Sequence, residues 1–197
     1  MKATNKFICV LLAAVLTVTG FSGCADSGEG ESSIGSSSYS VDVKGLATEG
    51  KIPEVTFALG SSVDEAVKHY QDAFAADNQN PEIVITEEDG NTEISVGAYS
   101  YFYKTERKAE GISAISVVDT AYGFYSGSVT MMQDVKSAID AEPAETEPTA
   151  EDVFFLPGSP PSGAKMLTYT FGGNVLKMIF YNNYLSAVFL YDSATFS

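Results

Sequence analysis

The sequence feature that most constrains the fold is a short segment that occurs twice. Ile112–Asp119 reads ISAISVVD, and Leu185–Asp192 near the end of the chain reads LSAVFLYD. The serine, the alanine and the final aspartate recur at a constant offset of 73 residues, from 112 to 185. A repeated segment of this kind predicts that one fold unit is present twice.

A second correspondence precedes the first in both halves. Gly60–Lys68 aligns with Ser128–Lys136 at an offset of 68 residues, and both segments have the pattern of a helix start. The two offsets differ by five residues, which a change in loop length accounts for. Because a helix signal and a strand signal follow each other in the same order twice, we predict a tandem duplication.

Two helices are predicted, at Ser62–Asp77 and Thr130–Ala141. The first begins with a capping box of Ser62 and Glu65, and the second begins with a threonine and a glutamine at the same spacing. Apolar residues at helical spacing follow both boxes, so each helix is expected to bury one side.

Strand patterns follow each predicted helix. They lie at Ile83–Thr86, Ile94–Tyr103 and Ile112–Val118 in the first half, and at Met166–Phe171, Val175–Tyr181 and Leu185–Tyr191 in the second, with Val153–Leu156 as a candidate edge strand. The predicted fold class is therefore α+β. It consists of two tandem units of helix plus antiparallel β-meander, with the helices packed on one face of the sheet.

The first residues have the pattern of a targeting signal. Lys2 and Lys6 precede the apolar run Phe7–Thr19, and Phe21-Ser22-Gly23 places small residues before Cys24. This resembles a bacterial lipoprotein signal peptide, here residues 1–24, whose cysteine is acylated with palmitate. The resemblance implies a lipid anchor at Cys24 on the extracytoplasmic face of the cell membrane. The alternatives are an ordinary secretory signal and a spanning helix, although the apolar run is shorter than the roughly 20 residues a bilayer requires.

Composition divides the remaining chain. Residues 25–51 are rich in serine, glycine and acids and predict a disordered tether. The two units are assigned to residues 52–125 and 126–197. The second unit contains an acidic loop at 140–152, with six acids, two prolines and no base, and such a loop is normally solvated.

Charge and cysteine content limit the partners. Without Lys2 and Lys6 the chain keeps 9 of its 11 basic residues against 26 acids, a formal charge of −17. Nucleic acid binding requires basic clusters that this sequence lacks. No cysteine follows Cys24, so a disulfide or a cysteine metal site is not expected. We expect the lipid to provide membrane attachment and another envelope or secreted protein to be the partner.

No catalytic residue, cofactor or metal site is predicted. His69 is the only histidine, so it would have to be the single base in nucleophilic catalysis. No cysteine follows Cys24 that could serve as the nucleophile. Phosphate-loop, dinucleotide and zinc motifs do not occur. Glu87, Glu88 and Asp89 form the densest acidic group at a strand end, which keeps a carboxylate-dependent hydrolase open as the enzymatic alternative. The protein is predicted not to be an enzyme.

Strand alternation predicts two unlike faces in the second meander. Leu176, Met178, Phe180, Leu185, Ala187, Phe189 and Tyr191 are expected under the helix. The opposite face is apolar and aromatic, which is typical of recognition surfaces. The residues predicted to contact a partner are Tyr99, Tyr101, Tyr103, Lys177, Ile179, Tyr181 and Tyr184. The alternative is that these faces pack on each other or on the linker.

The pattern of two tandem units over about Val55–Asp192 resembles the β-lactamase inhibitory protein and the related small lipoprotein of the outer-membrane assembly machinery. In the inhibitory protein two units join into one sheet whose open face binds a partner protein. The resemblance implies this architecture and transfers no functional residue. We therefore expect a non-catalytic protein-binding or scaffold module. The alternatives are an inhibitor of a secreted or periplasmic enzyme and the hydrolase named above.

Overall fold

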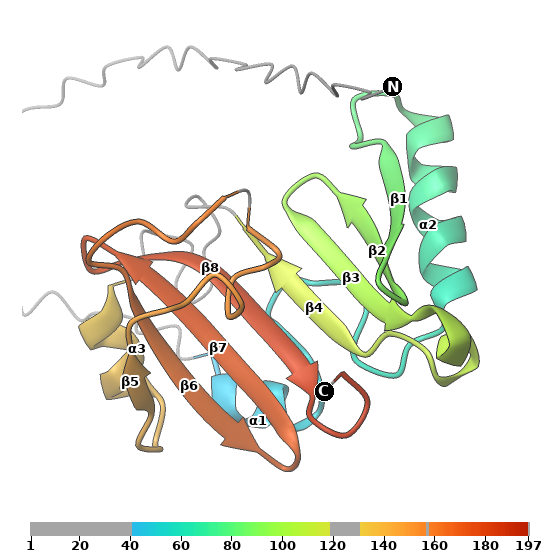
Figure 1. Cartoon of the computed structure of the whole chain (residues 1–197). Helices are drawn as coiled ribbons and strands as arrows, with labels where there is room; N and C mark the ends of the chain where they lie inside the picture. The colour runs from blue at the N-terminus through green and yellow to red at the C-terminus, as the bar shows by residue number, and fades with distance from the viewer. Residues whose placement is uncertain (1–40, 119–130, 157, 197) are drawn as a thin grey trace, which may run out of the picture. The chain divides into compact units, whose positions relative to one another are not determined.

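An eight-stranded antiparallel sheet carries the fold (Figure 1), and the α+β class predicted from the sequence is confirmed. The computed structural model describes residues 41–118, 131–156 and 158–196, which belong to the unit Ser37–Ser197. The predicted signal peptide, Cys24 and the first part of the predicted tether lie outside these residues. Among the described residues, no helix combines the length and the apolar character needed to span a bilayer.

The strands run across the sheet in the order β1-β2-β3-β4-β8-β7-β6-β5. One meander therefore extends from β1 to β4 and another from β5 to β8, and the last strands of the two meanders pair with each other. The elements in chain order are α1 Val43–Thr48, α2 Val63–Ala76, β1 Ile83–Glu88, β2 Asn91–Val96, β3 Tyr99–Lys104, the 3-10 helix η1 Thr105–Glu110, β4 Ala114–Val117, α3 Met132–Ala138, β5 Ala144–Thr146, β6 Lys165–Phe171, β7 Asn174–Tyr181 and β8 Tyr184–Asp192.

Each meander has four strands, where the sequence predicted three. The predicted strand Ile94–Tyr103 is divided between β2 and β3, because Gly97, with a φ of 61°, forms a two-residue turn with Ala98. β5 lies inside the predicted acidic loop, whereas Val153–Leu156 forms turns and not the predicted edge strand. The predicted strand number of both units is therefore wrong.

α2 confirms the predicted helix Ser62–Asp77 to within one residue at each end. The Glu65 amide donates a hydrogen bond to the Ser62 hydroxyl oxygen at 3.3 Å, which is one half of the predicted capping box. Val63 and Ala66 are buried on the side of the helix that the apolar spacing predicted.

α3 is shorter than the predicted helix Thr130–Ala141. Thr130 lies outside the described residues, and Met131 occupies the N-cap position without a side-chain hydrogen bond to the helix. The helix ends where Ile139 adopts an extended backbone, with φ of −89° and ψ of 112°. Val135 and Ile139 are buried, as the predicted apolar spacing requires.

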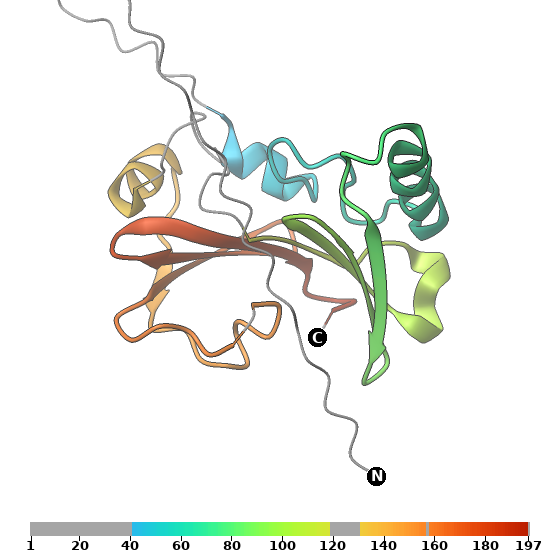
Figure 2. The same ribbon diagram turned by 90° about the horizontal axis from the view of Figure 1, so that it is seen from above.

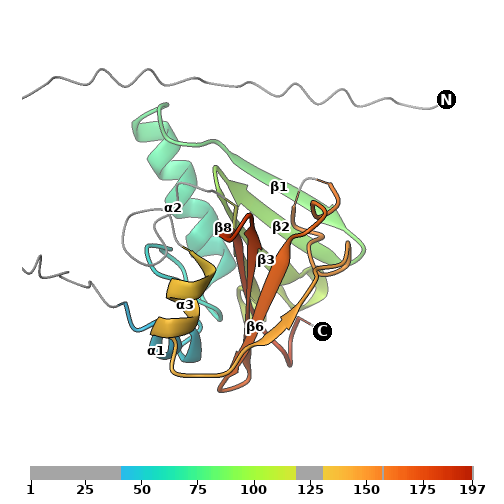
Figure 3. The same cartoon turned by 90° about the vertical axis from the view of Figure 1, so that its left-hand side faces the viewer.

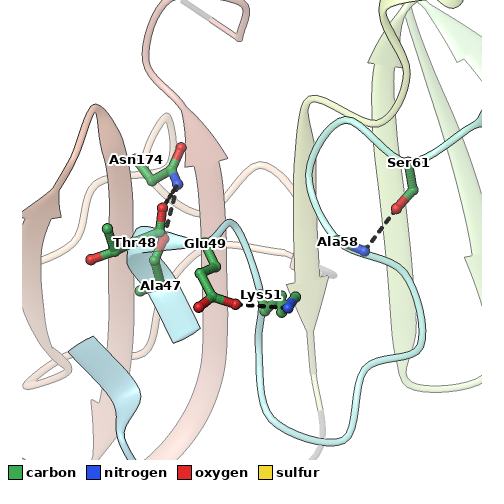
Figure 4. Close-up of polar contacts among 7 residues, drawn as sticks. All are labelled: Ala47, Thr48, Glu49, Lys51, Ala58, Ser61 and Asn174. Atoms are coloured by element: carbon green, nitrogen blue, oxygen red, sulfur yellow. Dashed lines mark hydrogen bonds and ion pairs between the residues drawn. The ribbon is translucent and has the colours of Figure 1, made fainter. Parts of the chain in front are cut away.

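α1 lies within the segment predicted to be a disordered tether, residues 25–51, and this part of that prediction is wrong. Val43 and Ala47 of α1 are buried. The side-chain amide of Asn174, at the start of β7, donates hydrogen bonds to the carbonyl oxygens of Ala47 at 2.9 Å and Thr48 at 3.2 Å (Figure 4). The apolar side chains of α1 pack against the sheet. The composition of this segment gives no indication of that packing.

The main apolar core lies between the sheet and the helices. Figures 2 and 3 show α1, α2 and α3 on the same side of the sheet. The helices contribute Val43, Ala47, Val63, Ala66 and Val135 to this core, and the strands contribute residues that include Ile94, Tyr101, Ile115, Leu167, Met178 and Leu190. We call the face of the sheet that carries these strand residues the helix side, and the opposite face the far face.

A β-bulge in β8 changes which of its residues lie on the helix side. Phe180 pairs with Leu185 but Ile179 pairs with Ala187, so Ser186 is an extra residue in the ladder. One extra residue reverses the alternation beyond it. Contrary to the prediction, Val188 and Leu190 are in the helix-side core, whereas Ala187, Phe189 and Tyr191 lie on the far face.

The middle of the far face is covered by residues 149–156. The Lys177 ammonium binds the Asp152 carboxylate at 2.7 Å, and these side chains are 17% and 24% exposed. Burial raises the pKa of Asp152, but hydrogen bonds from Lys177 and Thr149 outweigh burial and keep the pKa below its usual value. Val153 is buried against β6, β7 and β8. This end of the predicted acidic loop is therefore fixed on the sheet and is not a solvated loop.

Two buried tyrosines on the helix side provide a matched test of hydrogen bonding in the core. The Tyr101 hydroxyl lies 2.6 Å from the Tyr70 hydroxyl, whereas the Tyr169 hydroxyl has no hydrogen-bond partner among the described residues. We expect Tyr169→Phe to raise the free energy of unfolding by about 1 kcal/mol and Tyr101→Phe to lower it by about 1 kcal/mol. Urea unfolding at neutral pH measures both changes. Equal destabilisation by the two substitutions would contradict this account.

Gly111 lies between η1 and β4, against the loop before α2, and its substitution should be costly. Its φ is 87°, and an added Cβ would lie 2.6 Å from the backbone oxygen of Ser61, which accepts a hydrogen bond from the Ile112 amide. We expect Gly111→Ala to destabilise the fold by about 3 kcal/mol. Gly60→Ala is the control, because Gly60 also has a positive φ but has open space around it. The control should cost about 1 kcal/mol in thermal unfolding.

Candidate functional site

Three of the residues predicted to contact a partner are buried, so the prediction is wrong for them. Tyr101 is 0%, Tyr103 8% and Ile179 2% exposed. Tyr101 pairs with Ile94 and Ile115, which places it in the helix-side core. Burial, followed by the hydrogen bond to Tyr70, raises the pKa of its hydroxyl well above the usual value.

Lys177 and Tyr99 do not form an open recognition surface either. The Lys177 ammonium is bound to Asp152 under the covering segment, and it lies 5.9 Å from the centre of the Tyr191 ring. Tyr99 is partly buried and packs against the helix-side core. Ile179, which was predicted on the same face as Lys177, is covered by Val153. The far face is therefore largely an internal surface in the second meander.

Tyr181 and Tyr184 are exposed as predicted, at 42% and 46%. They form the closing pair of the β7–β8 hairpin, whose turn residues Asn182 and Asn183 have positive φ values of 52° and 68°. Met131, 41% exposed, forms a β-bridge to Tyr184. Directly paired residues share one face of a sheet, so the three side chains form a row on the far face. We call Met131, Tyr181 and Tyr184 the hairpin patch.

The hairpin patch has the chemistry of a protein-binding surface. A two-residue turn fixes the positions of both tyrosines, and the Met132 amide donates a hydrogen bond to the Asn183 carbonyl at 2.9 Å. Tyrosine rings bury large areas at low entropic cost, and methionine adapts its shape to a partner. The alternation of side chains on both sides of the predicted Asn182-Asn183 turn predicted that Tyr181 and Tyr184 are exposed. The position of Met131 depends on long-range pairing and was not predictable.

A cavity of about 270 Å³ lies on the far face of the first meander. Glu88, Asp89 and Glu93 line one part of it, and the rings of Phe102 and Phe154 line another. Phe154 is 52% exposed and stacks on Phe196, with ring centres 5.9 Å apart. Phe154 is not among the predicted site residues, because the pattern of Val153–Leu156 predicts an edge strand.

The residues considered for catalysis are not brought together. His69 is exposed, and its ring contacts Phe57 and Tyr70 edge to face, with ring centres 5.4 and 5.0 Å apart. Glu87 and Glu88 are exposed at the end of β1, whereas His69 belongs to α2. Within the described ranges, no group of three or more histidine, cysteine or acidic side chains is arranged to bind a metal ion.

Comparison with known proteins does not assign a family. No protein family matches the sequence, and no curated protein is detectably similar to it. Among solved structures, the chain is similar to the DUF4309 family protein YjgB from Bacillus subtilis, with a TM-score of 0.46 and 15% identity. The similarity covers 77% of this chain and 93% of that one.

Proposed function

We propose that this protein is a lipid-anchored, extracytoplasmic binding module that contacts another protein through the hairpin patch. The observation that carries the proposal is an exposed row formed by Tyr181 and Tyr184, on a hairpin fixed by a tight turn, and by Met131, which forms a β-bridge to Tyr184. Aromatic side chains in such a setting dominate the energetics of protein interfaces. The proposed function is binding without catalysis. The proposed binding surface is the exposed end of the sheet face that was predicted to contact a partner.

Anchoring is inferred from the sequence. Cys24 follows Phe21-Ser22-Gly23 after an apolar run, as in bacterial lipoproteins. The acidic protein surface has little attraction for anionic lipid, so the acyl chains supply the membrane affinity. The residues between Cys24 and α1 form the tether in this proposal.

We also infer that the two meanders arose by duplication, each as one helix and four strands with both helices on one face. Ser116 of β4 pairs with Phe189 of β8, and these positions are 73 residues apart, the offset of the sequence repeat. Paired residues share a face. A two-fold axis through this pair therefore superposes β4 on β8 and keeps every equivalent residue on its own face. A register shifted by one residue would exchange the faces.

The hairpin patch can be tested by truncating its tyrosines. Tyr181→Ala and Tyr184→Ala should each weaken partner binding by about 1–3 kcal/mol, because each removes an aromatic anchor. The lipid-free chain beginning after Cys24 is used to capture the partner from solubilised membranes, and the affinity of the purified pair is then measured.

The control for this test is Tyr101→Ala, which removes a buried ring. It should lower the free energy of unfolding by about 3–5 kcal/mol, whereas the two patch variants should unfold at nearly the wild-type temperature. If the patch variants lost stability and kept full affinity, both tyrosines would be core residues and the proposal would be wrong. A tight stoichiometric complex with a secreted enzyme would assign the patch to an inhibitor.

The anchor can be tested at Cys24. Cys24→Ala should release the protein from the membrane fraction or block its maturation, because the acylated thiol is removed. Incorporation of labelled palmitate and detergent partition measure the effect. Unchanged labelling and partition in the variant would rule out lipidation at this position.

A further inference from the structure

The two edges of the sheet differ in their protection against pairing with other strands. β5, at one edge, has three residues between Pro143 and Pro148. Glu145 of β5 forms an ion pair with Lys136 of α3. Short strands, prolines and charges are the usual means by which soluble proteins protect a sheet edge. The β5 edge is therefore closed to strand addition.

β1, at the other edge, lacks most of these protections. It has six residues and no proline, and Val84 and Ile85 are 55% and 51% exposed. These are two of the large apolar side chains most exposed in the described residues, and they are adjacent in sequence. Alternation places Val84 on the far face and Ile85 on the helix side, so the edge presents apolar surface on both faces.

The turn to β2 determines which backbone groups of β1 point outward. Asp89 and Gly90 have φ values of 49° and 76° and form a two-residue turn, so the closing pair Glu88 and Asn91 exchanges its hydrogen bonds. Alternation then directs the amide and carbonyl groups of residues 84, 86 and 88 toward β2 and those of residues 83, 85 and 87 outward. No strand in the described part of the chain pairs with the outward groups.

The charge around β1 indicates the kind of strand that fits. Residues 69–103 contain seven acidic residues and no lysine or arginine. At the edge itself, Glu82, Glu87 and Glu88 form no ion pair with any described residue. A second copy of this chain fits poorly, because antiparallel pairing centred on Ile85 sets Glu88 opposite Glu82 at both ends, and like charges in opposite positions are destabilising.

We propose that the β1 edge binds an extended segment of another protein in which apolar residues alternate with lysine or arginine. The segment adds to the sheet as a further strand. Its backbone pairs with the outward groups of Ile83, Ile85 and Glu87, and its apolar side chains cover Ile85 on the helix side. On the far face, the methylene stems of its cations lie over Val84 and their charges lie beside Glu82 and Glu88. This surface belongs to the first meander, whereas the hairpin patch belongs to the second, so the proposal does not depend on the patch.

Amide hydrogen exchange tests the predicted alternation directly. The probe is a peptide of alternating lysine and valine matched in length to β1, added to the lipid-free chain. The amides of residues 83, 85 and 87 should become protected on binding, while those of residues 84, 86 and 88 are protected already. A matched peptide methylated on every backbone nitrogen keeps its side chains and their charges. It should not confer protection, because neither of its edges can donate hydrogen bonds to the ladder.

Ile85→Pro is the informative variant. The amide of Ile85 points outward, so proline there removes a donor for the peptide without removing a bond to β2. It should weaken peptide binding about tenfold, and Ile85→Ala should weaken it much less. Continued protection of residues 84, 86 and 88 in the proline variant verifies that the β1–β2 hairpin is intact.

Two further variants distinguish strand addition at β1 from binding at the hairpin patch. Glu88→Lys should weaken binding of the lysine peptide, and Tyr181→Ala should leave it unchanged. Equal binding of the methylated and unmethylated peptides would show attraction by charge alone and overturn the proposal. Peptide binding without new protection of the amides of residues 83, 85 and 87 would overturn it as well. Concentration-dependent dimerisation that protects residues 83, 85 and 87 would identify a second copy as the occupant and also overturn it.

Discussion

The pairing of β4 with β8 is the interaction on which the rest of the structure depends, because it alone joins the two meanders into one sheet. β4 has only four residues, and all of them are buried. Ile115 and Val117 belong to the helix-side core, whereas Ala114 packs with Phe102 and Phe189 on the far face. A central strand buried on both faces requires cover on both faces. The helices provide it on one side, and residues 149–156 with Phe196 provide it on the other.

This requirement explains why the predicted recognition face is mostly internal. Phe155 stacks on Phe189 with ring centres 4.6 Å apart, and the Phe102 ring contacts Phe189 edge to face. The covering segment is fixed at its start by the ion pair between Asp152 and Lys177, which is partly shielded from solvent and therefore stronger than an exposed pair. Among the described residues, the large apolar side chains that stay exposed lie at the β7–β8 turn, at the β1 edge and at Phe154 of the covering segment.

Local sequence signals predicted the features that depend on local chemistry. The capping serine and apolar spacing gave the position of α2, and the paired asparagines gave the β7–β8 turn between two exposed tyrosines. The assignment of faces failed at Ser186, because one extra residue in a ladder reverses every later side chain and leaves no mark in the apolar pattern. The burial of Tyr101 and the order of α1 depend on contacts between distant segments. Such contacts leave no signal in local periodicity.

The two halves differ most at the outer edges of the sheet. In the second half, the short β5 is flanked by prolines and tied to α3 by an ion pair, so that edge presents little to another chain. In the first half, β1 is twice as long, and its glutamates form no ion pair with a described residue. An open edge carries a risk of aggregation, and like charges reduce that risk for copies of the same chain while leaving the edge accessible to a basic strand. In the proposed strand addition, the acidic charge of the first meander selects among partners, because it disfavours self-association and favours a segment of opposite charge.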